Sequence, residues 1–347
     1  MVANVSAPAA DPLKSATLAR VAVIVPAYGV ADLLGEALES LQRQTEPNWE
    51  CIVIDDGAPD DVAGAVAPYL RDPRIRFVST ANHGVSAARN RAIRETRAPL
   101  VVLLDADDLL RPGYLKLMAG TLEADPAARI ATCNARVFGA VTHETLVVSA
   151  RQGTGDGVRG SLSDVLDRSF NVYIGTTFRR ADFDAVDGFD ETMSHAEDFD
   201  LWVRLMLLGG HALYVNEVLG EYRVRNASAS ASGARMLRGS IQAYDKALER
   251  LGDGPEAAVA RDMRQRARAA LDLDDAIGRI AAGETAALPD LRATLPAPMS
   301  PLWTLAFALW ALVPALAPPM LRWRQRGHAR GSSDRLVPAL DAPNAVS

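Results

Sequence analysis

A run of apolar residues that ends in three carboxylates, from Pro99 to Asp108, constrains the fold of this chain more than any other stretch. Residues 100–104 are too few for a helix and are typical of a strand buried on both faces. Asp105, Asp107 and Asp108 follow at its carboxyl end, where open α/β sheets bind their ligands. Crowded carboxylates repel one another, and Mg²⁺ or Mn²⁺ would relieve that repulsion. The alternative at this point is a solvated acidic turn.

The composition fits one large α/β domain with additions, because 49% of the 347 residues are hydrophobic. The net charge of −6 gives no reason to expect a nucleic-acid partner. Cys51 and Cys133 lie in apolar stretches, which favours buried thiols over a disulfide. Residues 1–18 lack the apolar core of a signal peptide, so we expect a flexible N-terminus and a cytoplasmic protein.

Strand-like and helical segments alternate before the acidic stretch. The pattern predicts strands at residues 21–25, 51–54 and 75–78, and helices at 32–44, 61–70 and 85–97. Asp32 is the expected N-cap of the first helix. With the strand at 100–104, the order β-α-β-α-β-α-β is typical of a mainly parallel, doubly wound sheet.

The residues that follow these strands gather at one edge of the predicted sheet. They are Pro26, Tyr28, Asp55, Asp56, Asp105 and Asp107. A glycine loop beginning at Asn82 leads into a helix, where free backbone amides and the Arg89 guanidinium could meet phosphate oxygens. Two alternatives stay open: Arg89 as an ion-pair partner of the strand-end aspartates, and Asp55 or Asp56 as a cap of the next helix.

Several short motifs stand in order along about residues 19–228. They are Val25-Pro-Ala-Tyr28, Val53-Ile-Asp-Asp-Gly57, the stretch Asn82 to Asn90, Leu104-Asp-Ala-Asp-Asp108, Gly175-Thr-Thr-Phe-Arg-Arg180, Gly188-Phe-Asp-Glu191 and Glu197-Asp-Phe-Asp-Leu-Trp-Val-Arg204. Together they resemble glycosyltransferase family 2. The resemblance implies the α/β GT-A fold, which is Rossmann-like with a mainly parallel central sheet. It also implies inverting transfer of a sugar from a nucleotide-diphosphate donor, a UDP-sugar in the first instance.

The same resemblance implies a role for each matching residue. The donor site would comprise Pro26, Tyr28, Asp55, Asp56, Asn82 and Asp105, together with Arg89, which was singled out above from its place at a helix start, and Arg225, which departs from the family pattern. Within it, Asp55 or Asp56 would read the nucleobase. Asp105 and Asp107 would hold Mg²⁺ or Mn²⁺ with the diphosphate, and Asp198 would be the general base. Candidates for the acceptor side are Glu197, Thr176 and Trp202.

The general-base role of Asp198 can be examined physically. Asp198 stands at the start of a helix whose apolar residues, Phe199 and Trp202 among them, mark a core face. A helix N-terminus keeps a carboxylate ionised, whereas burial raises its pKa. An ionised Asp198 can take the proton of an attacking acceptor hydroxyl. The alternative is that Glu197 and Asp198 only begin the helix.

Two positions depart from the family pattern. Ala58 stands where a serine is frequent, and Arg225 stands where many members carry a histidine that helps to hold the metal or diphosphate. Arginine cannot ligate a cation, but it can bind a diphosphate bidentately. We therefore expect Arg225 to share the neutralisation of the diphosphate and the metal to be held more loosely.

The character of the chain changes after residue 228. We expect a helical extension over 229–290, with helices at 234–252 and 256–283 and a loop over 283–295, and a disordered tail over 327–347. Segment 291–326 is apolar and then basic. Trp303, Phe307 and Trp310 share one helical face, so we expect a peripheral contact with the inner face of the membrane. The alternative is that this helix packs on the catalytic domain.

The sequence therefore predicts an inverting glycosyltransferase that uses a saccharide or lipid-linked acceptor in bacterial cell-envelope polysaccharide synthesis. Two other classes remain as alternatives. One is a catalytically silent nucleotide-sugar binder, favoured by the missing histidine. The other is an Asp-x-Asp phosphohydrolase, which normally carries its pair after the first strand rather than the fourth.

Overall fold

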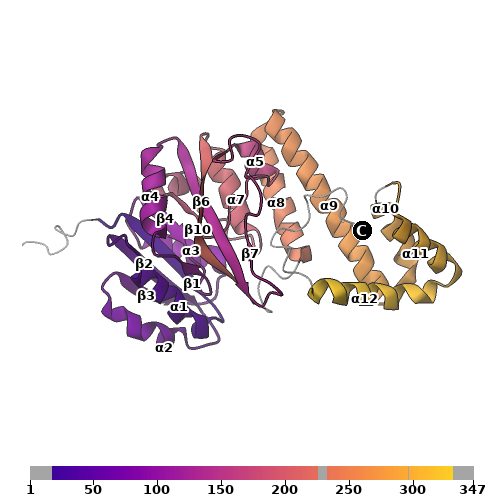
Figure 1. The fold of residues 1–347 in the computed structure, drawn as a ribbon, viewed down its shortest axis with the longest axis horizontal. Helices are drawn as coiled ribbons and strands as arrows, with labels where there is room; N and C mark the ends of the chain where they lie inside the picture. The colour runs from indigo at the N-terminus through magenta and orange to yellow at the C-terminus, as the bar shows by residue number, and fades with distance from the viewer. Residues whose placement is uncertain (1–17, 226–232, 296, 331–347) are drawn as a thin grey trace, which may run out of the picture.

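The computed structural model describes residues 18–225, 233–295 and 297–330 (Figure 1). The first half of the α/β part alternates strands and helices, as predicted. Its elements are β1 (Val21–Ala27), α1 (Ala31–Gln42), β2 (Trp49–Asp56), α2 (Val62–Val66), a 3₁₀ turn (Ala67–Arg71), β3 (Ile75–Thr80), α3 (Val85–Arg94) and β4 (Leu100–Leu103). The boundaries lie within three residues of the expected ones, except that α2 gives way to the 3₁₀ turn.

The second half of the α/β part completes the sheet. Its elements are β5 (Leu109–Leu110), α4 (Tyr114–Ala124), β6 (Ala128–Gly139), β7 (Thr145–Leu146), β8 (Arg159–Gly160), α5 (Leu162–Leu166), β9 (Thr177–Arg179), α6 (Arg180–Ala185), α7 (Glu197–Met206) and β10 (His211–Val224). The sheet order is β3-β2-β1-β4-β9-β6-β10-β5, with β7 on β6 and β8 on β10. The four neighbouring strands β3, β2, β1 and β4 are parallel to one another, and β9 is antiparallel to both of its neighbours, β4 and β6.

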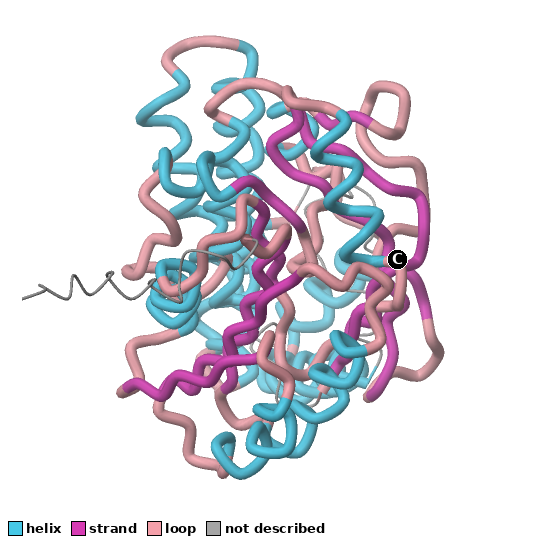
Figure 2. The backbone as a smooth tube through the Cα atoms, turned by 90° about the vertical axis from the view of Figure 1, so that its left-hand side faces the viewer, coloured by secondary structure: helices cyan, strands magenta, loops and turns pink. Residues whose placement is uncertain are grey.

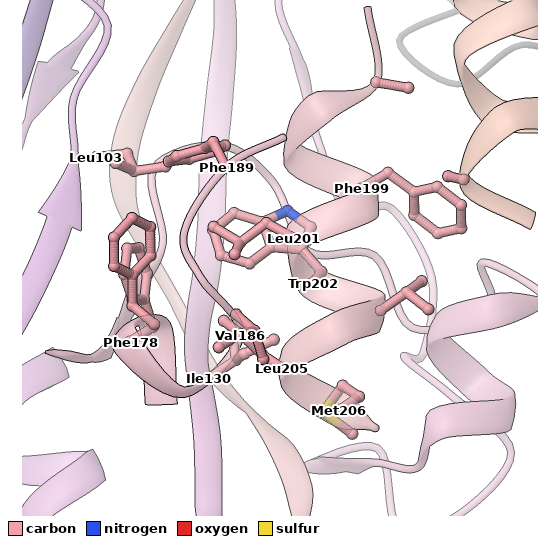
Figure 3. Packing of buried hydrophobic residues seen from close by; sticks show 14 of the residues in the cluster. Leu103, Ile130, Phe178, Val186, Phe189, Phe199, Leu201, Trp202, Leu205 and Met206 are labelled. Atoms are coloured by element: carbon pink, nitrogen blue, oxygen red, sulfur yellow. The ribbon is translucent and has the colours of Figure 1, made fainter. Parts of the chain in front are cut away.

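Helices cover both faces of the central strands (Figure 2). β4 is fully buried, and β1 is buried at every residue except Pro26, as strands covered on both faces must be. Leu34 and Leu38 of α1 pack on one face of the sheet. α7 packs on the other, where Trp202 and Leu205 face Phe178 of β9 (Figure 3). This packing holds the first residues of α7 beside the carboxyl end of β4.

The start of α1 differs from the expectation. Asp32 lies exposed in the first turn and does not cap the helix, whose N-cap residue is Val30. The carboxylate of Asp60 accepts the backbone N–H of Gly29 at 3.0 Å and of Ala31 at 2.7 Å instead. A carboxylate that is distant in sequence therefore satisfies amides that were assigned to a local cap.

The C-terminal extension is helical, as predicted. It contains α8 (Gly233–Leu251), α9 (Pro255–Ala281), a 3₁₀ turn (Thr285–Ala287), α10 (Leu288–Thr294), α11 (Pro301–Leu312), a second 3₁₀ turn (Pro314–Leu316) and α12 (Ala317–Arg330). The loop expected over 283–295 is wrong, because α10 forms there and buries Leu291. The expected flexible N-terminus lies outside the described residues except for Leu18. The expected disordered tail is wrong for residues 327–330, which belong to α12, and lies outside the described residues from residue 331 on.

α11 and α12 pack on the second half of α9 rather than on the sheet (Figure 1). Trp303 and Trp310 are only 5% and 2% exposed, because they cluster with Phe307 over Ile280 and Leu291. The expectation that this aromatic face contacts a membrane is therefore wrong. Among the residues that the structure describes, no helix combines the length and apolarity needed to span a bilayer.

Candidate functional site

A cavity of about 400 Å³ opens where the carboxyl ends of β1, β2 and β4 meet the first turns of α3 and α7 and the end of β10. It brings together ten of the residues singled out in the sequence. They are Pro26, Tyr28, Asp56, Asn82, Arg89, Asp105, Asp107, Glu197, Asp198 and Arg225. The edge of the sheet therefore gathers side chains that are up to about 200 residues apart in the sequence, as the strand order requires.

The two aspartates after β2 have different surroundings. Asp56 is buried and accepts the backbone N–H groups of His83 and Gly84, both at 2.9 Å, so it shapes the glycine loop before α3. Asp55 accepts the N–H of Ala58 at 2.8 Å and the hydroxyl of Ser79 at 3.0 Å, and it is not among the cavity-lining residues. Neither caps α2, since Asp61 accepts the N–H of Gly64 at 2.8 Å.

A glycine is required where this loop crosses β2. Gly57 has a φ of +64°, and a Cβ at that position would lie 2.7 Å from the backbone nitrogen of Asn82. Any other residue would therefore push the 82–84 loop away from the cavity. The close approach explains why the Asp-Asp-Gly sequence and the Asn-His-Gly sequence belong to one structural unit.

Arg89 connects the two sides of the cavity. It is 3% exposed, and its two terminal nitrogens donate at 2.8 Å to Asp105 Oδ1 and to Glu197 Oε1. The structure thus favours the ion-pair alternative over a direct phosphate contact, because both nitrogens already face carboxylates. The pairing also commits one carboxylate oxygen of Glu197, so its acceptor-side role is not supported by the geometry.

Two further arginines meet the acidic turn from the end of β10. Arg225 Nε lies 2.5 Å from Asp107 Oδ2. Asp108 is buried and accepts the backbone N–H of Arg223 at 2.8 Å, while Arg223 Nε donates to the carbonyl of Asp107 at 2.8 Å. Burial, followed by the charge of Asp105, raises the pKa of Asp107 and of Asp108. Arg223 was not predicted, although strand alternation places it on the same face as Arg225.

The charge balance of the cavity suits a cation that arrives with a diphosphate. Six carboxylates line the cavity against three arginines. Among the described residues no cluster of three His, Cys, Asp or Glu forms a closed metal site. Mg²⁺ and Mn²⁺ do not require one, because in phosphate-transferring sites one or two carboxylates and the substrate's phosphates complete the ligand set. Asp105 and Asp107 fit this requirement.

Asp198 stands on the first turn of α7, after Ala196 in a left-handed conformation with φ 57°. Its Oδ1 accepts the backbone N–H of Phe199 at 2.7 Å. Burial, and then the charge of Glu197, raises the pKa of Asp198 to about 6, against the opposing effects of that N–H and of Arg89 and Arg168. Burial thus outweighs the helix terminus, and a carboxylate with a pKa of about 6 has the property that a general base near neutral pH requires.

A second cavity of about 160 Å³ adjoins the first at Asp198. Trp202 lines it, and among the described residues the indole N–H of Trp202 has no hydrogen-bond partner. Phe199 also lines this cavity, although its side chain leaves α7 on another side than Trp202 and its ring packs against Tyr244 of α8 (Figure 3). Thr176 lines neither cavity: it is fully buried and donates to the Tyr173 carbonyl at 2.6 Å, which overturns its assignment to the acceptor side.

Arg168 is a residue of the second cavity that no sequence motif indicated. It has a left-handed backbone with φ 62°, and its guanidinium carbon lies 4.0 Å from the ring centre of Phe199. Its Nη2 donates to the hydroxyl of Ser240 at 3.0 Å. This arrangement holds a positive charge close to Asp198, and only the tertiary structure brings the three segments together.

The comparison with known families agrees with this geometry. Residues 22–186 match the family model described as glycosyl transferase family 2. The chain carries a glycosyl transferase family 2 domain. Chondroitin synthase of Escherichia coli is 28% identical over 205 residues, which cover 57% of this chain and 29% of that protein. Succinoglycan biosynthesis protein ExoU of Rhizobium meliloti is 29% identical over 269 residues, covering 70% of this chain and 74% of that protein.

The family 2 domain also resembles solved structures. TarS 1–349 of S. aureus in complex with UDP-GlcNAc has a TM-score of 0.59 and 17% identity, over 80% of this chain and 82% of that one. The mannosyltransferase PcManGT of Pyrobaculum calidifontis, in complex with GDP-Man and Mn²⁺, has a TM-score of 0.57 and 21% identity, over 92% and 88%. These likenesses confirm the GT-A fold. By contrast, the chain spans less than a third of the length of chondroitin synthase.

Proposed function

We propose that this chain is an inverting glycosyltransferase that moves a sugar from a nucleotide-diphosphate donor, a UDP-sugar in the first instance, to a hydroxyl of a saccharide or lipid-linked acceptor. The observation that carries the proposal is the position of Asp198 at the junction of the two cavities. A donor in the larger cavity and an acceptor in the smaller one would meet at its carboxylate.

The larger cavity has the features that a nucleotide-sugar site needs. Pro26 and the half-exposed Tyr28 offer an apolar wall for the nucleobase, and the loop that Asp56 holds presents its backbone beside it. Asp105 and Asp107 would hold Mg²⁺ or Mn²⁺, which neutralises the charge of the diphosphate when bound. Arg225 is placed to contact the same oxygens. The nucleotide-sugar complexes of TarS and PcManGT support a donor of this class.

The reaction then follows from the positions of the side chains. Asp198 accepts the proton of the acceptor hydroxyl as its oxygen bonds to the anomeric carbon. The bond from that carbon to the diphosphate oxygen breaks at the same time, and the electron pair leaves on the diphosphate. Because Asp198 lines both cavities, an acceptor in the smaller one would attack the anomeric carbon from the side away from the diphosphate, and such an attack inverts the anomeric configuration.

The cellular process and location of the reaction are proposed from the similar proteins and from the proposed saccharide or lipid-linked acceptor. A chondroitin synthase and a succinoglycan biosynthesis protein are among the similar proteins, which supports a role in polysaccharide synthesis. We place the reaction in the cytoplasm at the inner face of the membrane, where cell-envelope saccharides are assembled on lipid carriers.

The stereochemistry of the product tests the proposal. A panel of nucleotide sugars is first screened by thermal shift with and without Mn²⁺, and the stabilising donor is then incubated with saccharide acceptors. We expect an α-linked donor to give a β-linked product in NMR spectra. A retained configuration would refute inversion. Stabilisation without any transfer would favour the silent binder, and phosphate release from simple phosphomonoesters would favour the phosphohydrolase.

Asp107→Asn tests the cation site. Removing one of the two proposed carboxylate ligands should weaken donor binding in Mn²⁺ by about tenfold or more, because a hard cation needs anionic oxygens. Isothermal titration with the donor, with and without Mn²⁺, measures the effect. Asp32→Asn makes the same charge change on the exposed first turn of α1 and should leave binding unchanged. If Asp107→Asn binds donor as tightly as wild type in Mn²⁺, the assignment of the metal site fails.

A further inference from the structure

The C-terminal helices expose a concentration of apolar side chains. Of the fourteen large hydrophobic residues that are exposed in the described part of the chain, eight lie between residues 302 and 323. We call them the apolar face; they are Leu302, Leu305, Leu309, Leu312, Val313, Leu316, Met320 and Trp323. Scattered exposed leucines are normal on a protein surface, whereas a concentration of exposed apolar side chains on consecutive helices favours a contact site.

On α11 the apolar face is the outer side of a helix whose inner side is already filled. On α11, Leu302, Leu305, Leu309 and Leu312 recur at intervals of three or four residues, so they share one face. Trp303 and Trp310 lie on the other side and are buried against α9 and α10. Packing within the chain therefore accounts for the aromatic residues and leaves the leucines without a covering element among the described residues.

The charges around the apolar face indicate an anionic partner. Residues 291–330 contain no acidic residue, and residues 293–321 contain no charged residue at all. Arg322 is exposed at the end of this stretch, and Arg324, Arg326 and Arg330 follow it in the sequence. A second copy of the chain would offer the same uncharged face and the same basic end. A lipid surface with anionic head groups offers both apolar depth and opposite charge.

The length of the helix decides how it would meet a membrane. The twelve residues of α11 extend for about 18 Å, well short of the roughly 30 Å of a bilayer core. A proline at position 314 then interrupts the helical run before α12. The segment can therefore lie along the membrane surface with its leucines among the acyl chains, but it cannot cross.

We infer that the apolar face docks on an anionic phospholipid surface, with its side chains inserted at the interface and Arg322 beside the head groups. The contact would hold the family 2 domain where a lipid-linked acceptor is found, so its biological purpose rests on the proposed function. Lipid binding itself needs neither donor nor acceptor, and the two proposals can fail separately.

Trp323 provides a direct spectroscopic test. It is 79% exposed, whereas the other four tryptophans of the chain are at most 5% exposed. Full-length protein is mixed with phosphatidylcholine vesicles of rising phosphatidylglycerol content. We expect co-sedimentation that increases with the anionic fraction, a blue shift of the emission and quenching by brominated lipid. The Trp323→Phe variant should still sediment but should lose the shift and the quenching.

Leu305→Glu/Leu312→Glu tests the apolar face itself. Both side chains are exposed, so the fold should be retained, and vesicle binding should fall by at least about tenfold. Leu70→Glu is the matched control, because Leu70 is an exposed leucine on the 3₁₀ turn after α2, outside the apolar face. This variant should bind vesicles as wild type does. High salt should weaken wild-type binding only in part, since screening does not affect the apolar contribution.

Three outcomes would overturn the inference. One is wild-type protein that stays in the supernatant at every lipid composition. Another is unchanged vesicle binding in the double variant. The third is a concentration-dependent dimer, seen by sedimentation velocity without lipid, that the double variant dissolves. Donor-induced thermal shift should be the same in wild type and in the double variant, so a failure of lipid docking would not be mistaken for a failure of the donor site.

Discussion

Asp198→Asn should lower the rate of sugar transfer by about 100-fold or more and leave donor affinity within about threefold of wild type. The amide keeps the size of the side chain but cannot accept the acceptor's proton. Because Asp198 also lines the second cavity and is not one of the residues proposed to bind the donor, donor affinity should survive. Turnover at saturating donor and donor titration by calorimetry measure the two effects. Unchanged turnover would return Asp198 to the role of a residue that only begins α7.

The dependence of turnover on pH gives a second view of the same carboxylate. A general base works only when it is ionised, and the pKa of Asp198 is raised to about 6. Turnover should therefore rise with pH, increase most steeply up to about pH 6 and then level off. The diphosphate of a nucleotide sugar is esterified at both ends and does not titrate in this range. The residual activity of Asp198→Asn should not show this rise with pH.

Glu197→Gln separates the base from its neighbour. The charge of Glu197 raises the pKa of Asp198, so removing that charge should move the rising limb to lower pH. The informative result is the shift of the rising part of the pH profile to lower pH. A general loss of structure would instead lower turnover at every pH without shifting the profile. A limb that stays in place would mean that another group controls the pH dependence.

The parallel half of the fold could be predicted because its strands are local and unambiguous. Val21–Val25 and Leu100–Leu104 are short apolar runs with a polar or proline stop, and such runs leave little choice except a strand buried on both faces. Once four strands alternate with helices, their carboxyl ends must share an edge. The meeting of Asp56, Asp105 and Asp107 in one cavity follows from that order alone.

The partners of the charged residues could not be predicted, because they depend on contacts between distant segments. Asp32 is close to the start of α1 in the sequence, whereas Asp60 is 29 residues away from Ala31. Only the fold shows that Asp60, and not Asp32, accepts the backbone N–H of Ala31. Arg89 is a mixed case. Its pairing with a strand-end aspartate stood as an alternative in the sequence and is found with Asp105, but its second partner, Glu197, is 108 residues away and only the fold reveals it.

The C-terminal helices show a limit of periodicity. Trp303, Phe307 and Trp310 do share a face, as their spacing indicates, but leucines fill the opposite face of the same helix. When both faces are apolar, spacing alone cannot tell which one packs against the protein. The larger aromatic side chains pack inside, where they bury more surface, and the leucines remain outside.

Arg89→Met should lower the free energy of unfolding by about 3 kcal/mol, the size typical of removing one partner from a buried ion pair. Arg89 is 3% exposed and is the cation between Asp105 and Glu197. Without it, two carboxylates from β4 and α7 would face each other in a partly buried space. Urea denaturation followed by circular dichroism measures the change. Arg89→Lys should recover only part of the stability, because a single ammonium cannot reproduce the fork that reaches both partners.

Arg91→Met is the matched control for Arg89→Met. Arg91 lies on the same helix, two residues further on, and its guanidinium pairs with Glu95 at 2.6 Å, but its side chain is 52% exposed. An exposed pair of this kind contributes about 0.5 kcal/mol or less, so the variant should unfold almost as wild type does. Equal losses from the two variants would mean that helix propensity rather than the buried bridge sets the stability. A loss confined to Arg89→Met would show that one guanidinium holds the Asp105 side and the Glu197 side of the cavity together.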